Sequence, residues 1–256
     1  MKTSFTNRDG KKIVVLVENT EGKNGPVFIA HGLAGNKEQP HIKAYAKAFL
    51  LNDYIVVRWD AINTLGESEG SLFNATLTNY FKDFEDVINW AKTQEWYKEP
   101  FVVTGHSLGS ACNILYTQKH PKKIKALAPT SAFLSGSTYL NWLGEDEVSL
   151  WQRKGYREEE SKSKPGIIKK FNWKLAEDLL KYELFDIAKS ISVPILLIVG
   201  SKDWGTPLKT QQKFYDLLPT NNKELHIIKE AGHTFRTKEH LKEIQDLMTT
   251  WAKKQI

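Results

Sequence analysis

Short apolar runs alternate with amphipathic segments along most of this chain of 256 residues. The apolar runs are rich in β-branched residues, are bounded by Gly, Pro, Asn or Asp, and occupy residues 27–30, 54–59, 101–104, 125–128, 195–199 and 225–228. Such runs are typical of parallel strands that are covered on both faces. Between them, helical spacing puts Tyr80, Phe84 and Val87 on one face, and Leu241 and Ile244 on another. The alternation predicts an α/β protein whose mostly parallel sheet carries helices on both faces.

The beginning of the chain has a different pattern. Asp9-Gly10 precedes a short apolar run at residues 12–17. Because Asp-Gly between strand-like segments is a hairpin signal, we expect an antiparallel hairpin at one edge of the sheet.

A second departure from the alternation spans residues 133–190. This segment has no clear core strand, but it contains Trp142, Trp151 and a polar run at residues 152–164 whose charges should face water. A long ordered excursion between two core strands is usually functional. We therefore expect an inserted cap or lid at residues 133–190, with the core domain formed by residues 1–132 and 191–256.

Composition and charge narrow the class of protein. The chain is 41% hydrophobic and 26% charged, which is ordinary globular usage and disfavours a disordered chain. The formal net charge of +6 comes from lysines scattered along the sequence, so we expect a solvated surface and no nucleic-acid partner. The single cysteine, Cys112, allows no intramolecular disulfide and lies in an apolar stretch that is typical of a buried side chain.

Targeting signals are not visible in the sequence. Residues 1–10 are polar and lack the apolar core of a secretory signal, and no apolar stretch approaches the length of a membrane span. We expect a cytoplasmic protein without stable membrane insertion. Secretion stays open for the case in which a leader has been removed.

The strongest chemical signal is a serine between two glycines. Residues 101–109 read FVVTGHSLG, an apolar strand followed by Gly-His-Ser-Leu-Gly, and a helical run begins directly after it. This is G-x-S-x-G in the strand, sharp turn and helix that a nucleophile elbow requires. The turn strains the backbone of Ser107 so that its hydroxyl projects from the sheet edge, and the glycines let strand and helix approach closely. Ser107 is therefore our candidate nucleophile.

A serine hydroxyl needs a base in hydrogen-bonding reach, and the base needs an orienting acid. After the apolar run at 195–199 the chain reads GSKDWGTP, which puts Asp203 at the carboxyl end of a strand, where α/β sites are built. Asp186 and Asp216 are weaker candidates because they fall in helix-like segments. After the last apolar run the chain reads KEAGHTF, which puts His233 in a loop before the final helix. The resulting order of serine, acid and histidine is the usual one where a G-x-S-x-G elbow carries the nucleophile.

The other histidines fit the role of base less well. His31 and His106 flank the site but precede the acid, which is the wrong order. His41 is expected at the start of a helix. The remaining three have ordinary places at helix ends or on the surface, namely His120, His226 and His240.

The oxyanion of a tetrahedral intermediate needs hydrogen-bond donors. The residue after the nucleophile, Leu108, supplies one backbone N–H. Residues 29–35 read IAHGLAG, with His-Gly directly after a strand, so the N–H of Leu33 is the best candidate for the second donor. The two leucine side chains are then placed to line an acyl pocket.

Together these segments resemble the serine-hydrolase branch of the α/β-hydrolase superfamily over nearly the whole chain. HGLAG resembles the oxyanion loop, GHSLG the elbow, GSKDWGTP the acid loop and AGHTF the histidine loop. Residues 58–70, RWDAINTLGESEG, resemble the segment that follows the fourth strand, although residues 61–65 lack the Arg-Gly pair that is usual there. That departure affects the shape of the loop, and Ser68 in this segment is interpreted as structural. Among members, the chain is most similar to small capped esterases such as cinnamoyl or feruloyl esterases and monoacylglycerol-lipase-like enzymes.

The resemblance implies a serine esterase that hydrolyses carboxylic esters through an acyl-enzyme on Ser107, with hydroxycinnamoyl or short to medium acyl esters as substrates. Trp142, Trp151 and Trp204 are expected to contact the small-molecule ester. No metal or organic cofactor is expected, since the chain has no C-x-x-C pair or H-E-x-x-H motif.

A peptidase, an amidase or an acyltransferase would use the same three residues, so these activities stay open. A dehalogenase is disfavoured because its nucleophile would be an Asp at position 107, and a binding module on a decayed fold is disfavoured because all three residues are present in order. Acyl length, the leaving alcohol and the oligomeric state are not fixed by the sequence.

Overall fold

A central sheet organises the computed structural model, which describes residues 1–161 and 166–255. In these residues the sheet has eight strands in the order β1-β2-β4-β3-β5-β6-β9-β10. Their bounds are β1 Lys2–Thr6, β2 Lys12–Glu18, β3 Pro26–Ala30, β4 Ile55–Trp59, β5 Phe101–His106, β6 Ile124–Thr130, β9 Ile195–Gly200 and β10 Lys223–Ile228. From β4 to β10 every neighbouring pair is parallel, whereas β1 pairs antiparallel with β2 and β2 with β4. The mostly parallel sheet predicted from the alternation is confirmed.

The antiparallel edge is the hairpin expected from Asp9-Gly10. Strands β1 and β2 pair from Lys2↔Leu16 to Thr6↔Lys12, and Gly10 lies in the turn with φ +74. The side chain of Asn7 accepts hydrogen bonds from the amides of Asp9 and Lys11 and so stabilises this turn.

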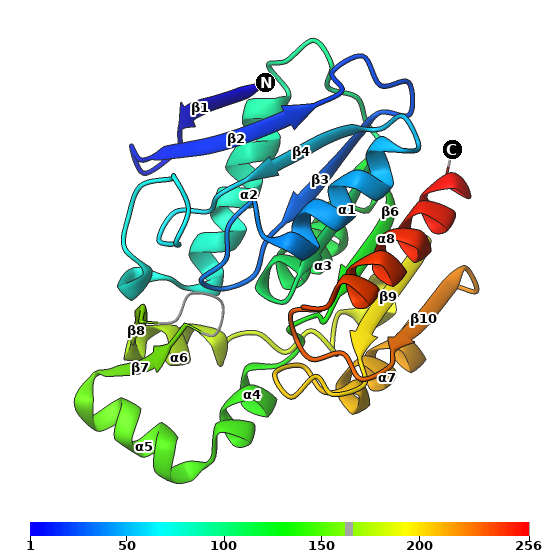
Figure 1. Ribbon diagram of the computed structural model, residues 1–256. Coiled ribbons are helices and arrows are strands. Elements are labelled where there is room, and N and C mark those ends of the chain that lie inside the picture. Colours follow the sequence, from blue (N-terminus) through cyan, green and yellow to red (C-terminus); the bar gives the residue numbers. More distant parts are fainter. Residues whose placement is uncertain (162–165, 256) are drawn as a thin grey trace.

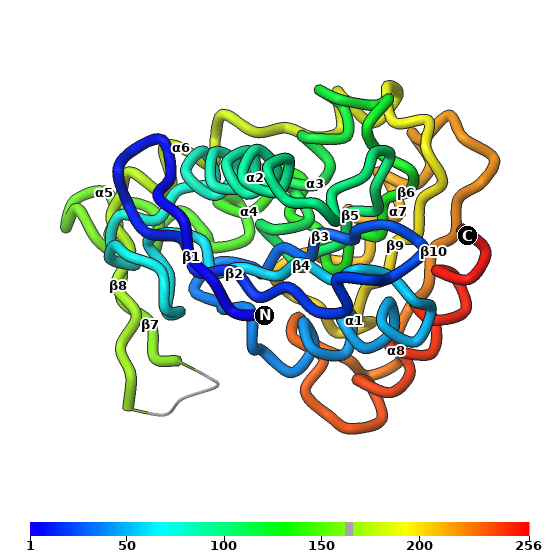
Figure 2. The backbone as a smooth tube through the Cα atoms, turned by 90° about the horizontal axis from the view of Figure 1, so that it is seen from above, coloured from blue at the N-terminus to red at the C-terminus, as the bar shows by residue number. Residues whose placement is uncertain are grey.

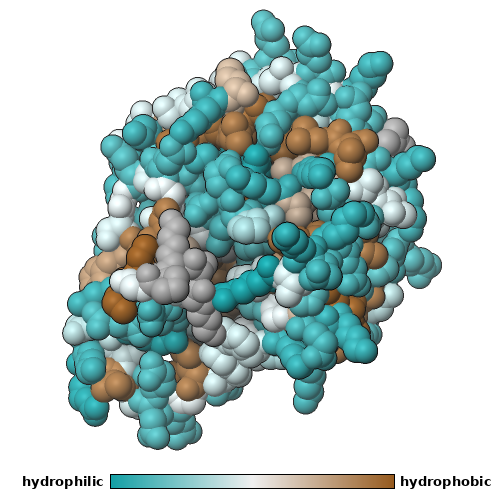
Figure 3. Space-filling model, viewed as in Figure 1, coloured by the Kyte–Doolittle hydropathy of each residue, from teal (hydrophilic) through white to brown (hydrophobic). Residues whose placement is uncertain are grey.

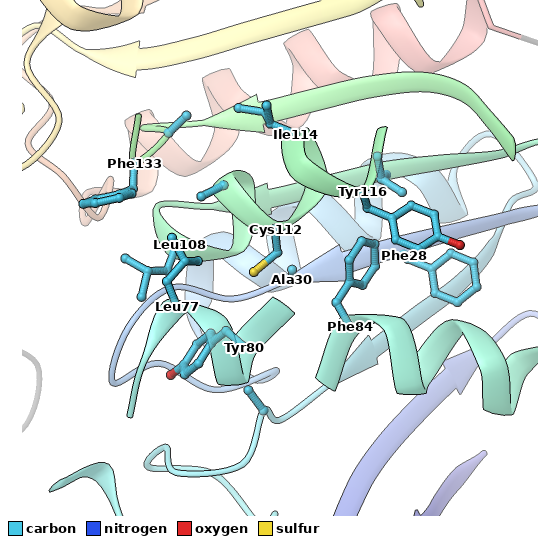
Figure 4. Close-up of a cluster of buried hydrophobic side chains, with 14 of the residues drawn as sticks. Phe28, Ala30, Leu77, Tyr80, Phe84, Leu108, Cys112, Ile114, Tyr116 and Phe133 are labelled. Carbon is cyan, nitrogen blue, oxygen red and sulfur yellow. The ribbon is translucent and has the colours of Figure 1, made fainter. Parts of the chain in front are cut away.

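Helices cover both faces of the sheet (Figure 2). Helices α2 Leu77–Ala91, α3 Leu108–Lys119 and α7 Leu208–Leu217 pack on one face, and α1 Pro40–Leu50 and α8 Lys238–Lys253 pack on the other. The two faces of a strand alternate, so Val103 and Leu197 join the first core cluster and their neighbours Val102 and Leu196 join the second. Figure 4 shows part of the first cluster, where Cys112 is buried between α2 and the sheet, as expected.

The described part of the segment between β6 and β9 adds no strand to the central sheet. Its elements are α4 Gly136–Leu143, α5 Glu145–Lys154, β7 Tyr156–Glu160, β8 Ile168–Asn172, α6 Trp173–Leu179 and the short 3-10 helix η3 Ala188–Ser190. The elements from α4 to α6 lie beyond the carboxyl ends of the parallel strands (Figure 1), whereas η3 directly precedes β9. Two further 3-10 helices, η1 Leu72–Asn74 and η2 Pro121–Lys123, lie in the core region.

Strands β7 and β8 form a separate antiparallel pair that the polar run at 152–164 did not predict. Opposite charges face each other across this pair, with Glu158 on Lys170 and Glu159 on Lys169. Such cross-strand pairs support a polar hairpin that no apolar pattern reveals. The last part of the run, residues 162–164, lies outside the described residues.

The surface seen in Figure 3 is mainly hydrophilic, with hydrophobic side chains in small separate groups. None of the helices described by the structure has the length and apolar character needed to cross a membrane.

Candidate active site

Strand β5 ends in a strained turn that carries Ser107. The serine has φ +53 and ψ −116, and α3 begins at the next residue, Leu108. A positive φ is costly for a residue with a Cβ, by about 1–3 kcal/mol, and persists only where the surrounding structure enforces it. Gly109 is required here, because a Cβ at this position would lie 2.3 Å from the carbonyl oxygen of Ala30 on β3. The geometry is that of the predicted elbow.

Hydrogen bonds from buried hydroxyl groups stabilise this turn. The carbonyl of Gly105 accepts hydrogen bonds from Ser110 Oγ and Thr130 Oγ1, each at 2.7 Å. The amide of Ser107 donates to the carbonyl of Thr130 at 3.0 Å, and Tyr45 Oη lies 2.6 Å from Thr130 Oγ1. Sequence reasoning did not single out these residues, although Thr130 lies directly after an apolar run, where site residues are common.

The structure brings Ser107, His233 and Asp203 together from three different loops. His233 Nε2 lies 3.1 Å from Ser107 Oγ, and His233 Nδ1 lies 3.0 Å from both carboxylate oxygens of Asp203. A carboxylate only accepts hydrogen bonds, so the proton is on Nδ1 and Nε2 is left to accept the serine proton. Ser107 is 8% exposed and Asp203 is 5% exposed, so both side chains are largely shielded from solvent.

Asp203 is held as a carboxylate by its loop. Burial alone would raise its pKa, but the hydrogen bond from His233 and the positive charge that His233 can carry keep the pKa below its ordinary value. The amides of Gly205 and Thr206 and the hydroxyl of Thr206 donate to the same carboxylate at 2.8–3.0 Å. Thr206 was not identified from the sequence. The feature that could have indicated it is a hydroxyl residue three positions after the acid in GSKDWGTP.

The two alternative acids lie elsewhere. Asp186 is exposed in a turn between α6 and η3, so its predicted helical setting is wrong. Asp216 is exposed near the end of α7, as expected for a helix. Among the described residues, neither carboxylate has a hydrogen bond or ion pair with His233.

The loop after β3 passes close beside the nucleophile. A Cβ on Gly32 would lie 3.1 Å from the Cβ of Ser107, so the next amide, that of Leu33, is near the serine. In the part of the chain that the structure describes, the Leu33 amide donates to no backbone carbonyl. The amide of Leu108 is the first of α3, and amides in the first turn of a helix have no partner within the helix.

A buried ion pair fixes this loop. Lys37 donates to Asp60 through both its amide, at 2.7 Å, and its Nζ, at 2.6 Å. Burial alone would lower the pKa of Lys37, but hydrogen bonds to Asp60 and Glu67 raise it above its ordinary value. Ser68 donates to the carbonyl of Asp60 at 2.6 Å, which agrees with its structural interpretation.

The predicted substrate tryptophans separate into two groups. Trp142 and Trp204 are each 43% exposed and stack on each other with ring centroids 4.6 Å apart, and Trp204 lies 6.2 Å from the ring of His233. The ring of Tyr139 contacts Trp142 on one side and Phe133 on the other. We call Phe133, Tyr139, Trp142 and Trp204 the aromatic row. Trp151 is 1% exposed, donates to the carbonyl of Phe171 and packs on Trp173 instead.

No cluster of three or more His, Cys, Asp or Glu side chains placed to hold a metal ion was found among residues 1–161 and 166–255. The groups that hydrogen bonds join at this site are the Ser107 hydroxyl, the His233 imidazole and the Asp203 carboxylate.

The fold is similar to that of several solved structures. Est1E from Butyrivibrio proteoclasticus, solved with ferulic acid bound, has a TM-score of 0.81 and 19% identity, with coverage of 100% of this chain and 98% of that chain. Alpha/beta hydrolase domain-containing protein 10 from mouse has a TM-score of 0.82 and 16% identity, with 99% of each chain covered. A monoacylglycerol lipase from Paleococcus ferrophilus has a TM-score of 0.77 and 20% identity, with 95% and 99% covered.

The sequence itself matches a family model. The model described as serine aminopeptidase, S33 matches residues 22–239, which include the elbow, the acid loop and the histidine loop. The match covers most of the chain, and the similar structures have the same fold. The protein is a hydrolase of the α/β-hydrolase fold and belongs to the serine aminopeptidase S33 family.

Proposed function

We propose that this hydrolase is a serine esterase that cleaves carboxylic esters through an acyl-enzyme on Ser107. The observation that carries the proposal is the continuous hydrogen-bonded path from Ser107 through His233 to Asp203, located at a strained elbow. A strained backbone at a serine is costly and is typical of functional sites.

In the proposed reaction, His233 Nε2 takes the proton of Ser107 as its Oγ bonds to the ester carbonyl carbon. The carbonyl electron pair moves onto oxygen, and the amides of Leu33 and Leu108 donate to this oxyanion. When the oxyanion collapses, the bond to the leaving alkoxide breaks and His233 returns the proton to it. Water then repeats both steps on the acyl-enzyme and releases the acid. Asp203 stays ionised throughout and stabilises the imidazolium.

For the substrate, we propose an ester with an aromatic or other bulky apolar group. The aromatic row extends from the segment 133–190 to the acid loop and offers flat apolar surface beside His233. Leu108, Leu77 and Phe133 lie close together at the elbow end of the core cluster (Figure 4) and supply an apolar boundary for the acyl group. The similar structures include an esterase with ferulic acid bound and a monoacylglycerol lipase, which agrees with this class.

We also propose that residues 133–190 act as a cap over the site. Two features support this role: α4 carries Trp142 into contact with Trp204 of the acid loop, and the elements from α4 to α6 lie beyond the carboxyl ends of the strands (Figure 1). Trp151 is then assigned to the interior of the cap and not to the substrate.

A panel of esters tests the proposal. Hydrolysis rates are measured for p-nitrophenyl esters of increasing acyl length and for a methyl hydroxycinnamate, with Ser107→Ala as control. We expect turnover that depends on Ser107, and covalent labelling of wild type by a fluorophosphonate. An enzyme that hydrolyses none of these esters, or whose Ser107→Ala variant is equally active, would contradict the proposal.

A peptidase is the second candidate, because the matching family model is described as a serine aminopeptidase. It requires the same residues but must expel an amine, a poorer leaving group than an alcohol. Aminoacyl p-nitroanilides, tested beside the ester panel, distinguish the two activities by kcat/KM. An added alcohol that competes with water for the acyl-enzyme would instead indicate acyl transfer.

A further inference from the structure

The residue before the nucleophile makes a contact that the proposed reaction does not use. His106 is the last residue of β5 and is 3% exposed. Its Nε2 lies 2.6 Å from the main-chain carbonyl oxygen of His233, and the two imidazole rings lie 4.6 Å apart. A carbonyl only accepts, so the ring of His106 donates its Nε2–H to the backbone of the base.

The ring of His106 is well suited to be a lasting donor. It is packed between His41, with ring centroids 4.4 Å apart, and Phe235, with centroids 6.3 Å apart. Burial first, and then the neighbouring charges of His41 and His233, place the pKa of His106 well below its ordinary value. It therefore stays neutral when His233 becomes an imidazolium, and it adds no second positive charge beside the base.

Two contacts position His233 relative to the acid loop. Asp203 fixes the far nitrogen of the ring and acts through the acid loop. The backbone of the histidine loop is attached to that same acid loop by Lys202 N donating to Ala231 O at 2.9 Å. Both contacts tie the base to the acid, and neither ties it to the strand that carries the nucleophile.

The contact from His106 joins the backbone of the base to the strand that carries the nucleophile. His106 and Ser107 are consecutive residues, so a bond from His106 to the His233 carbonyl links nucleophile and base through one peptide unit. We propose that His106 is a positioning residue that sets the distance between the base His233 and the nucleophile Ser107 by donating to the His233 carbonyl. The inference rests on the proposed function, in which these two groups exchange a proton.

Three variants of the full chain test this role. His106→Leu fills the space but cannot donate, His106→Gln keeps an N–H near the same place, and His41→Leu removes a neighbouring buried imidazole that is not bonded to the His233 backbone. We expect His106→Leu to lower kcat by roughly 10- to 100-fold, the range that a displacement of about 1 Å costs. KM should change by less than about threefold, because the contact serves the transition state rather than substrate binding. His106→Gln and His41→Leu should keep kcat within about threefold of wild type.

Crystal structures of the same variants provide a readout that does not require activity. The distance from His233 Nε2 to Ser107 Oγ, 3.1 Å in the native chain, should exceed about 3.5 Å in His106→Leu and stay in hydrogen-bonding range in His106→Gln. If His106→Leu does not fold, His106→Met replaces it, since an unbranched thioether adapts to irregular space.

The outcomes distinguish failure of the positioning role of His106 from failure of the proposed esterase function. A wild-type rate or an unchanged distance in the variant without a donor overturns the positioning role, and so does a His106→Gln variant that is as impaired as His106→Leu. If Ser107→Ala is as active as wild type, the proposed function fails, while the measured distance still decides whether His106 positions the loop.

Discussion

At the scale of single residues, the proposed chemistry depends on one proton transfer between Ser107 and His233, whose reacting atoms are 3.1 Å apart. Ser107→Ala and His233→Ala should each lower kcat by at least about 10³-fold, and the double variant should lose little more, because the two groups act as a unit. Ser68→Ala is the matched control, a serine in a second G-x-S-x-G sequence, and should stay within about threefold of wild type. Steady-state kinetics on a p-nitrophenyl ester, with circular dichroism to show folding, measures this. Additive losses in the double variant would speak against a shared step.

Asp203 supports a second prediction at this scale. An amide in place of the carboxylate would offer an N–H to His233 Nδ1 and favour the tautomer whose Nε2 cannot accept from serine. Asp203→Asn should therefore cost roughly 10³- to 10⁴-fold in kcat, by analogy with serine proteases. Asp186→Asn, an exposed carboxylate in a turn, should leave kcat unchanged. If Asp186→Asn lowered kcat and Asp203→Asn did not, Asp203 would not be the acid that orients His233.

The sequence predicted that three residues of diagnostic type and order lie together, and it did not predict contacts that only the geometry reveals. Ser107, Asp203 and His233 each follow an apolar run, so their shared location at one sheet edge could be inferred. The contact of His106 with the His233 carbonyl could not, because it joins residues 127 positions apart through a main-chain atom. Trp151 was expected to contact the ester, but it is 1% exposed and packs on Trp173.

At the scale of elements, the segment 133–190, which we propose to be a cap, also contributes to the core. Thr78 on α2 donates to Asp178 on α6 through both its amide and its hydroxyl. Leu175 and Leu179 belong to the main core cluster. Removing the whole segment would expose that core, so its role is better tested by single side chains.

The aromatic row provides such a test. Trp142→Ala should lower kcat/KM for a hydroxycinnamate ester by roughly 5- to 30-fold, since losing an aromatic contact costs about 1–2 kcal/mol. The rate on p-nitrophenyl acetate should change far less, because a small ester does not reach the row. Leu180→Ala is the control: Leu180 is in the same segment, is 48% exposed and is not part of the row. Equal losses on both esters would show that Trp142 supports the fold of the site and not its selectivity.

At the scale of the whole molecule, the sheet was predictable because each buried strand carries its own apolar run and its own turn residues. All six runs assigned to parallel strands correspond to β3, β4, β5, β6, β9 and β10. The apolar pattern leaves the order of these strands in the sheet open, since pairing depends on contacts far apart in sequence. The polar hairpin of β7 and β8 was not predicted, because it has no alternation of apolar residues. Its strands are paired through opposite charges.

Buried ionisable groups make the stability of the whole molecule depend on pH. Burial lowers the pKa of His31, His41 and His106, to about 3 for His41. The ordinary pKa of histidine is about 6.5. As the pH falls below this value, these positions bind protons in the unfolded chain but stay neutral in the folded chain, so the folded state loses stability. Asp83 acts in the opposite direction, because burial raises its pKa to about 7 and the folded chain retains a proton that the unfolded chain has lost.

His41 isolates one of these contributions. It is 2% exposed, and in the part of the chain that the structure describes its Nε2 has no hydrogen-bond partner. In wild type this residue alone should decrease the free energy of unfolding by up to about 1.4 kcal/mol for each pH unit below 6.5, until the pH approaches 3. His41→Leu cannot bind a proton in either state, so its stability should fall less steeply as the pH is lowered, while the two proteins should show the same slope above pH 7. Urea unfolding at several pH values between 4.5 and 8 measures both curves. Parallel curves over the whole range would mean that His41 is protonated in the folded chain as readily as in the unfolded one, and that its buried position does not exclude the charge.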